Sequence, residues 1–182
     1  TGYGEDNWRY VIADYNLLPA KPTLDGEPSY EGIPQGLHDT IQPRWTADDV
    51  RRYAYWSVFS GACGFTYGHN SIMQFHRKGD KDAAYGALEP WNVAIHAQGA
   101  FQMNYLKKLM ESKPYFERIP DQTLIVGEQG LKYDYLAATR GVDYAFIYTF
   151  NGRSFSINTS KIKANKLKAS WYNPKNGQAM LI

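Results

Sequence analysis

The sequence predicts an α/β fold followed by a small antiparallel β module, and three features of its 182 residues lead to this prediction. Helical spacing of apolar residues alternates with short buried strands over residues 1–113. Residues 114–121 carry two prolines and form the predicted linker. From residue 122 onward, short strand-like runs are separated by turn residues. Helices that alternate with buried strands imply a parallel sheet covered by helices, either doubly wound or closed into a barrel.

The first predicted unit is a helix followed by an extended strand. Residues 7–18 carry apolar side chains at helical spacing, and Pro19 ends this pattern. We expect the strand that follows to end at Glu27, because a proline at position 28 disfavours the α conformation at the preceding residue. Residues 29–45 contain glycine and proline and are predicted to form a loop.

The second unit repeats the order of helix, strand and polar loop. Thr46 and Asp49 have the spacing of a capping box, which predicts a helix that runs to about Ser60. Residues 62–65 are short, apolar and bounded by glycines, as in a buried strand. Residues 91–112 then predict one long helix. Because two parallel strands would leave open edges and little core, we expect the first domain to continue upstream of Thr1.

The last third reads as an antiparallel module. Asn151-Gly152 predicts a tight hairpin, because a type I′ turn needs positive φ at both central residues. The strands expected on this basis are residues 133–139, 144–150, 154–157 and 168–172.

Composition excludes several classes of function. With 20 Lys and Arg against 18 Asp and Glu, the chain is not a nucleic-acid polycation, and no apolar run approaches the length of a membrane span. Six Lys or Arg and no acidic residue follow position 150, a positive segment that could meet an acidic glycan or nucleic acid, although exposed lysines more often serve solubility and block edge pairing. Fifteen Tyr, eight Phe and five Trp could stack on sugars or simply cover strand and helix faces. Cys63 is the only cysteine, so an intrachain disulfide is excluded.

Polar residues follow both predicted strands, which places them at one edge of the sheet. Asp25, Glu27 and Glu31 follow the first strand, and the cluster after the second consists of Tyr67, His69 and Asn70. Glycosidases need two carboxylates across the scissile bond, and Glu27 is the best candidate for one because Pro28 holds its backbone extended. The alternative is that Glu27 pairs with Arg44 or caps a loop.

The other polar residues are candidates for substrate contacts. His69 could orient or protonate a substrate group, while Tyr67 and Asn70 could bind sugar hydroxyls or fasten the loop. Trp45 could stack on a sugar ring. His38, His76 and His96 share no metal-ligand spacing, and no cysteine offers one, so we expect neither a metal nor another cofactor.

Five blocks resemble the apiosidase-like (β/α)-barrel glycoside hydrolases and their C-terminal domain. Three of them resemble the barrel, and two resemble the small β-sandwich that follows it and is described as collagen-binding in that family. The blocks are KPTLDGEPSYE (residues 21–31), DVRRYAYWS (49–57), GFTYGHN (64–70), YDYLAA (133–138) and WYNPKNG (171–177).

The resemblance implies a fold, a reaction and the location of the two catalytic carboxylates. Residues 1–113 would supply the last two βα units of an eight-stranded TIM barrel, and residues 122–182 a truncated β-sandwich. Glu27 would be the nucleophile of a retaining glycoside hydrolase acting on plant-type or other polysaccharides, with Glu31 as second choice. The acid/base would lie upstream of Thr1, so this chain alone would be inactive. The alternative is a non-catalytic carbohydrate- or collagen-binding module on a degenerate barrel. We expect the protein outside the cytoplasm.

Overall fold

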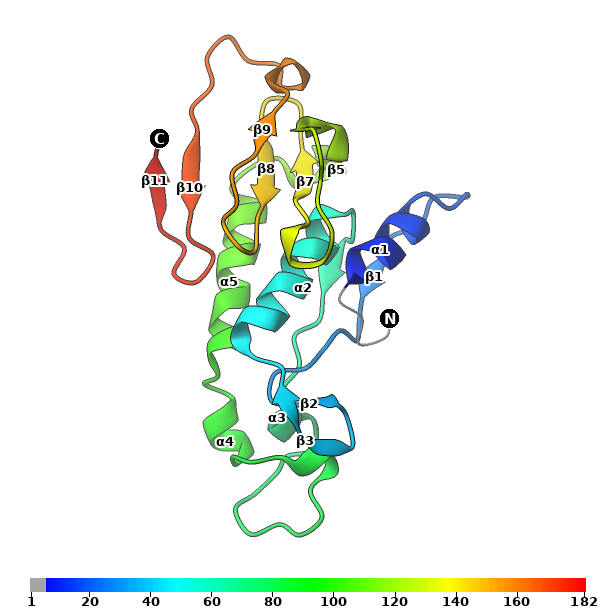
Figure 1. Ribbon diagram of the computed structural model, residues 1–182, viewed down its shortest axis with the longest axis vertical. Helices are drawn as coiled ribbons and strands as arrows, with labels where there is room; N and C mark the ends of the chain where they lie inside the picture. Colours follow the sequence, from blue (N-terminus) through cyan, green and yellow to red (C-terminus); the bar gives the residue numbers. More distant parts are fainter. Residues whose placement is uncertain (1–5) are drawn as a thin grey trace.

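A computed structural model describes residues 6–182 as a mixed helix and strand chain with several small sheets (Figure 1). The α-helices are α1 (Asn7–Tyr15), α2 (Ala47–Phe59), α3 (Asn70–Met73), α4 (Trp91–Ala94) and α5 (Gln98–Glu111). Single 3₁₀ turns occur at Ala84–Gly86, Tyr115–Glu117, Gln122–Leu124, Lys132–Asp134 and Thr159–Lys161. None of the helices in residues 6–182 is long and apolar enough to cross a membrane.

The two strands predicted in the first part of the chain are present and run parallel. β1 (Leu24–Asp25) pairs with β4 (Gly64–Phe65), with Leu24 opposite Gly64 and Asp25 opposite Phe65. The strand expected to end at Glu27 is shorter than predicted, because the backbone leaves the ladder after Asp25 and bends at Glu27. This part therefore has mixed helix and strand content with one parallel pair of strands.

The segment between the first strand and α2 contains a hairpin that the sequence did not predict. β2 (Pro34–Gly36) and β3 (Asp39–Arg44) pair antiparallel, although Pro43 lies within β3. Proline donates no ladder hydrogen bond, so the sequence of this strand predicts a loop. Within a sheet, proline is tolerated only at an exposed edge or a bulge. All of β3 except Arg44 is exposed.

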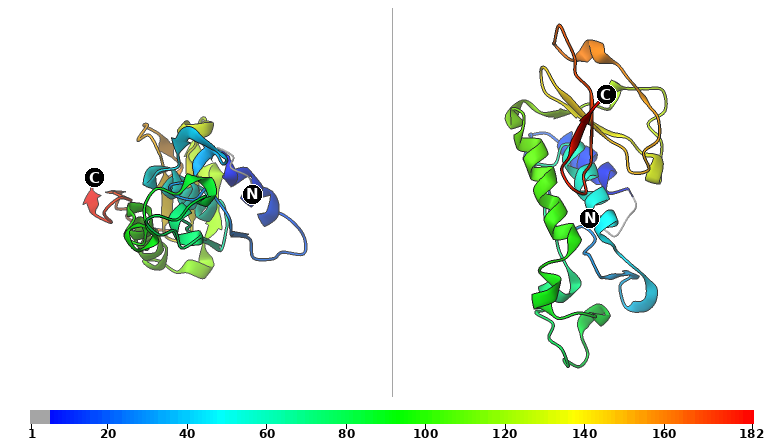
Figure 2. Two further views of the ribbon diagram at one scale, coloured as in Figure 1. Left: turned by 90° about the horizontal axis from the view of Figure 1, so that it is seen from below. Right: turned by 90° about the vertical axis from the view of Figure 1, so that its left-hand side faces the viewer.

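Helix α2 occupies the centre of the molecule and begins with the predicted capping box. The Asp49 carboxylate accepts from the Thr46 backbone N–H over 2.9 Å, and the Asp49 N–H donates to the Thr46 hydroxyl. From residue 50 onward every residue of α2 is buried. Figures 1 and 2 show α2 packed between α1 and α5.

The long helix predicted over residues 91–112 is interrupted. α4 ends at Ala94 and α5 begins at Gln98, with Ala97 extended at φ −61° and ψ 147°. The break separates two helices that face different neighbours, α3 for α4 and α2 for α5. The prediction of one continuous helix was wrong because the apolar spacing continues through the break.

The last third consists of short antiparallel strands. β5 (Ile119–Pro120), β7 (Ala137–Arg140) and β8 (Ala145–Tyr148) form one sheet, in the order β5-β7-β8. β6 (Ile125–Val126) pairs with β9 (Ser156–Ile157), and β10 (Ser170–Tyr172) pairs with β11 (Ala179–Leu181). The predicted antiparallel pairing is confirmed.

The hairpin expected at Asn151-Gly152 is absent. β8 pairs with β7 and β9 pairs with β6, so no ladder joins the strands on either side of the turn. Gly152 has a φ of 72°, whereas Asn151 is not among the described residues with positive φ. The Asn151 side chain instead accepts the Arg153 N–H, and this local turn redirects the chain.

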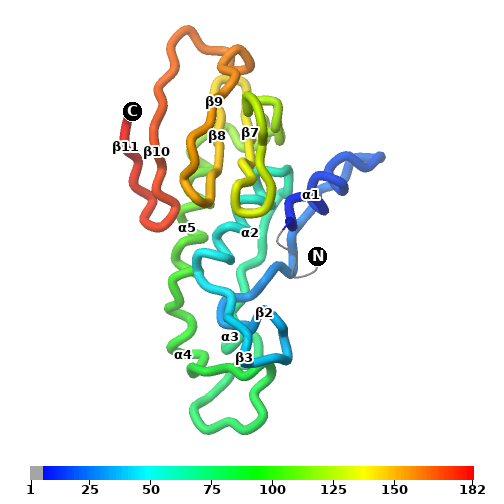
Figure 3. The backbone as a smooth tube through the Cα atoms, in the orientation of Figure 1, coloured from blue at the N-terminus to red at the C-terminus, as the bar shows by residue number. Residues whose placement is uncertain are grey.

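The molecule is elongated, with residues 119–182 at one end and the loop between α3 and α4 at the other (Figure 3). The main apolar core nevertheless joins both parts. It contains residues of α2 and α5 together with Tyr135, Ala137 and Tyr148 from the last third. A second, smaller core of four buried residues lies wholly within the last third.

Candidate functional site

The loops after β1 and β4 meet at one edge, as the sequence predicted. Beyond the two-residue ladder, Glu31 and His69 form an isolated parallel bridge. The Glu31 N–H donates to the Gly68 carbonyl over 2.9 Å, and the Asn70 N–H donates to the Glu31 carbonyl over 2.9 Å. Residues 26–30 therefore form a bulge between two paired positions, Asp25 opposite Phe65 and Glu31 opposite His69.

Glu27 lies on this bulge. Its side chain is exposed, and within residues 6–182 it makes no described hydrogen bond or ion pair. Arg44, the alternative partner considered above, donates instead to the Gly32 carbonyl over 2.6 Å and to the Gly86 carbonyl over 2.8 Å. The carboxylate of Glu27 is thus open to solvent at the edge where the two loops meet.

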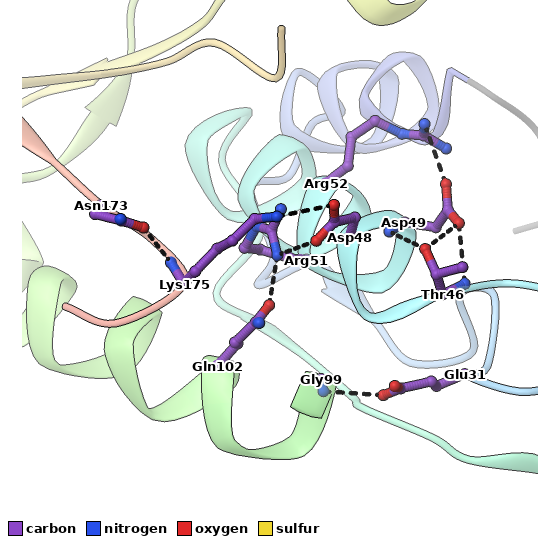
Figure 4. A network of polar contacts seen from close by, with 10 residues as sticks. All are labelled: Glu31, Thr46, Asp48, Asp49, Arg51, Arg52, Gly99, Gln102, Asn173 and Lys175. Atoms are coloured by element: carbon purple, nitrogen blue, oxygen red, sulfur yellow. Dashed lines mark hydrogen bonds and ion pairs between the residues drawn. The ribbon is translucent and has the colours of Figure 1, made fainter. Parts of the chain in front are cut away.

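Glu31 has the opposite environment. Its carboxylate Oε2 accepts the Tyr67 hydroxyl over 2.8 Å and the Gly99 N–H over 3.0 Å. Gly99 lies in the first turn of α5, whose amide groups have no partner within the helix, and the capping residue Ala97 supplies no side-chain acceptor. Glu31 therefore caps α5 from another element (Figure 4).

Burial and the neighbouring Glu31 carboxylate raise the pKa of Tyr67, which keeps its hydroxyl protonated and donating. A phenol held in this way fixes Glu31 in one orientation. Of the predicted site residues, Glu31, Tyr67 and His69 are brought together.

His69 is 5% exposed and lies against two carboxylates. Its Nδ1 accepts the Ser71 N–H over 3.1 Å, so the proton of the neutral ring is on Nε2, which lies 3.2 Å from an oxygen of Glu89. Burial lowers the pKa of His69, and the opposing effect of Glu31 and Glu89 does not offset it. The imidazole is therefore neutral at neutral pH and donates toward Glu89.

Asn70 and Asp25 hold the frame of the site. Asn70 is buried, donates to the Tyr85 carbonyl over 3.1 Å and accepts from Gln74 over 2.8 Å. The Asp25 carboxylate accepts from Asn7 over 2.9 Å and from the Ser57 hydroxyl. These contacts place Asp25 between α1 and α2, away from Glu31 and His69, and give no support for a substrate contact.

A wide, solvent-open cavity of about 620 Å³ lies beside Glu31. Its wall includes Trp45 and the first turn of α2, His69 from the loop after β4, Glu89 from the segment before α4, Gln98 from α5, and Lys175 from the last third. Trp45 is 6% exposed and its ring meets Tyr53 edge-on, so it supplies a largely buried wall.

Sequence reasoning missed four residues of this region. Glu89 and Lys175 reach it from distant parts of the chain, and no local pattern marks them. Asp48 was seen only as part of a helix start. Gly99 had a usable signal, since glycine in the first turn of a helix often marks a close approach. Within residues 6–182 no group of three or more His, Cys, Asp or Glu could hold a metal ion.

Comparisons with known proteins agree on one class. Residues 1–117 match the family model described as apiosidase-like, catalytic domain, and residues 119–182 match a model described as a collagen-binding domain of a collagenase. Among curated proteins, none matches the chain.

Solved structures match nearly the whole chain. One, named glycoside hydrolase, is 52% identical with a TM-score of 0.95, and the match covers 98% of this chain and 40% of that one. Another, a glycoside hydrolase family 5 protein from Bacteroides vulgatus ATCC 8482, is 51% identical with a TM-score of 0.95, covering 98% and 39%. The chain thus spans about 40% of the length of these structures.

Proposed function

The chain belongs to the apiosidase-like family, and from that premise we propose that it forms the C-terminal part of a glycoside hydrolase that cleaves oligosaccharides or polysaccharides of plant type. The observation that carries this proposal is the 52% identity over 98% of the chain to a structure named glycoside hydrolase. A polysaccharide substrate also favours a location outside the cytoplasm.

The parallel strands β1 and β4 are proposed as the last two strands of a (β/α)₈ barrel, whose remaining strands would come from outside residues 1–182. In such barrels the active site lies at the carboxyl ends of the strands. The loops that carry Glu27, Glu31 and His69 follow those ends, which supports a catalytic mouth at this edge.

Glu27 is the proposed nucleophile. A nucleophilic carboxylate must be able to reach the anomeric carbon, and the Glu27 side chain is exposed next to the end of β1. In a retaining mechanism Glu27 would attack that carbon while a second carboxylic acid, on a strand outside this chain, protonates the leaving oxygen. The resulting glycosyl-enzyme would be hydrolysed by water, which the second carboxylate deprotonates.

Glu31 is proposed as a positioning residue instead of the nucleophile. Both described donors to its carboxylate, Tyr67 and Gly99, are fixed parts of the frame, and the bond to Gly99 joins the loop after β1 to the start of α5. Moving this carboxylate onto a sugar would leave a helix amide without a partner. Among the other candidates, His69 and Trp45 line the cavity and remain proposed sugar contacts.

The test compares two isosteric changes in the protein as its gene encodes it. We expect Glu27→Gln to reduce hydrolysis of aryl glycosides by at least about 10³-fold with an unchanged melting temperature, because the carboxylate does chemistry and holds nothing. Glu31→Gln should lower the melting temperature and reduce activity less. With Glu27→Ala, added azide should restore turnover and yield a glycosyl azide of inverted anomeric configuration.

The converse result would identify the other carboxylate. If Glu31→Gln abolishes turnover at unchanged melting temperature while Glu27→Gln stays active, Glu31 is the nucleophile. If the unmodified protein hydrolyses no glycoside, the enzymatic proposal itself fails. Retention of Glu27→Gln protein on immobilised collagen would then favour the second candidate, a binding module, for which the match of residues 119–182 is the supporting observation.

A further inference from the structure

The cavity beside Glu31 receives one side chain from the last third of the chain. Lys175 lies in the turn between β10 and β11, and its ammonium group donates to Asp48 in the first turn of α2 over 3.0 Å. Figure 4 shows Lys175 reaching from this turn toward Asp48 and Arg51. The last third therefore forms part of the wall of a cavity that begins at the proposed catalytic loops.

The turn that carries Lys175 is held firmly on α5. The Lys175 N–H donates to the Asn173 side chain over 2.9 Å, and the Tyr172 hydroxyl donates to the Tyr105 carbonyl over 2.9 Å. Gly177 has a φ of 73°, and a Cβ there would lie 2.6 Å from the Tyr105 ring, so the turn packs directly against the helix. Lys175 is placed by this packing and not by the ion pair alone.

Asp48 is fixed just as closely. Its other oxygen accepts from Arg51 over 2.8 Å, and Arg51 also donates to Gln102 of α5 over 2.5 Å. Burial alone would raise the pKa of Asp48, but the hydrogen bonds from Lys175 and Arg51 outweigh it and hold the pKa below the ordinary value. Lys175 and Asp48 thus present a fixed ammonium beside an ionised carboxylate at the cavity.

The lining selects against anions. Glu31, Asp48 and Glu89 are opposed by Lys175 and by Arg51 behind Asp48, and His69 is neutral, so the described site keeps a net negative charge. Such a site repels uronic acids and phosphates. A donor beside an acceptor suits the neighbouring hydroxyls of a neutral sugar, and the open depression of about 620 Å³ has room for one.

We infer that this cavity is a subsite for a neutral sugar residue remote from the scissile bond, and that Lys175 contacts that sugar. Glu27 does not line the cavity, so the sugar bound there is not the one that is attacked. The inference rests on the proposed glycosidase function. It makes the last third a part of the substrate site.

The experiment uses the whole protein and two substrates of the same sugar, a 4-nitrophenyl glycoside and a neutral oligosaccharide. Lys175→Met keeps the aliphatic stem and removes the donors. We expect kcat/KM for the oligosaccharide to fall about 10- to 100-fold, mainly through KM, since a hydrogen bond from a charged group is lost. The aryl glycoside, which does not reach the subsite, should change by less than about twofold. Lys175→Arg should restore much of the loss.

Lys168→Met is the matched control, because Lys168 is an exposed lysine of the same segment and lines no described cavity. It should alter neither substrate. An equal loss on both substrates, or a lower melting temperature that accounts for the loss, overturns the inference and leaves the glycosidase proposal intact. A selective loss on oligogalacturonides overturns the neutral-sugar assignment. Failure of the unmodified protein to cleave any glycoside overturns both proposals.

Discussion

At the scale of single residues, Gly99 decides whether the Glu31 loop and α5 can meet. A Cβ at this position would lie 2.8 Å from Val50 and 2.9 Å from the Tyr67 ring, and it would also strike the Glu31 carboxylate. We therefore expect Gly99→Ala to destabilise the protein by about 1–3 kcal/mol through overpacking and loss of the Glu31 contact. Urea unfolding of the two proteins measures this difference.

The sign of this effect is informative, because alanine is normally the better helix residue by about 1 kcal/mol. The neighbouring change Gln98→Ala serves as control, since Gln98 is exposed in the same helical turn and its replacement should shift stability by less than about 0.5 kcal/mol. A gain in stability for Gly99→Ala would show that Glu31 and α5 are not in contact.

At the scale of elements, the C-terminal end of α2 depends on a residue from beyond α5. Arg118 donates to the carbonyls of Val58 and Ala62 over 2.5 and 3.0 Å, and to the Thr139 hydroxyl over 3.3 Å. A guanidinium here satisfies a carbonyl at the helix end and opposes the negative end of the helix dipole. It also ties α2 to β7.

We expect Arg118→Ala to lower stability by about 2–3 kcal/mol, because partly buried carbonyls lose a charged donor. Arg118→Lys should recover only part of this, since one ammonium cannot reproduce the planar fork. Thermal unfolding followed by circular dichroism gives the comparison, and Arg9→Ala, at an exposed ion pair with Asp6, is the control with little expected effect. Equal stability of Arg118→Ala, Arg118→Lys and Arg9→Ala would show that Arg118 does not stabilise the end of α2.

The elements also show how far local sequence determines this fold. The capping box of α2 and a strand near residue 64 depend on neighbours within a few positions, and both were predicted, although the strand is shorter than residues 62–65 and only partly buried. The break before α5 and the pairing of β6 with β9 depend on tertiary contacts, so apolar spacing and the Asn151-Gly152 signal predicted the wrong structures.

The candidate site divides in the same way. Consecutive parallel strands end at one edge, which is why the meeting of Glu31, Tyr67 and His69 could be expected from order alone. The position of Asp25 could not be predicted in this way. β1 ends at Asp25, so the alternation of side chains along a strand does not extend to Glu27. Lys175 lies 127 positions after Asp48, and no local pattern connects them.

At the scale of the whole molecule, the last third shares its core with α2. Tyr55 stacks on Tyr148 at 4.5 Å between ring centroids, and Trp8 stacks on Tyr135 at 3.9 Å. Arg52 is fully buried and lies over rings from both parts, including Tyr53 of α2 and Phe150 beyond β8. Apolar surface buried in this way stabilises both partners together.

We therefore expect residues 122–182 to unfold in the same cooperative transition as α2 in the whole protein, and residues 122–182 alone to stay unfolded or to aggregate. Removing α2 would expose Tyr135, Ala137 and Tyr148, leaving only the core of four buried residues around Leu124, which is too small for independent folding. Calorimetry of the whole protein and near-ultraviolet circular dichroism of the 122–182 fragment test this. Two separate heat-absorption peaks, or a folded and soluble 122–182 fragment, would mean that the last third is an autonomous module. Lys175 would then belong to a domain that can move relative to the cavity. The proposed sugar subsite would no longer have a wall of fixed position.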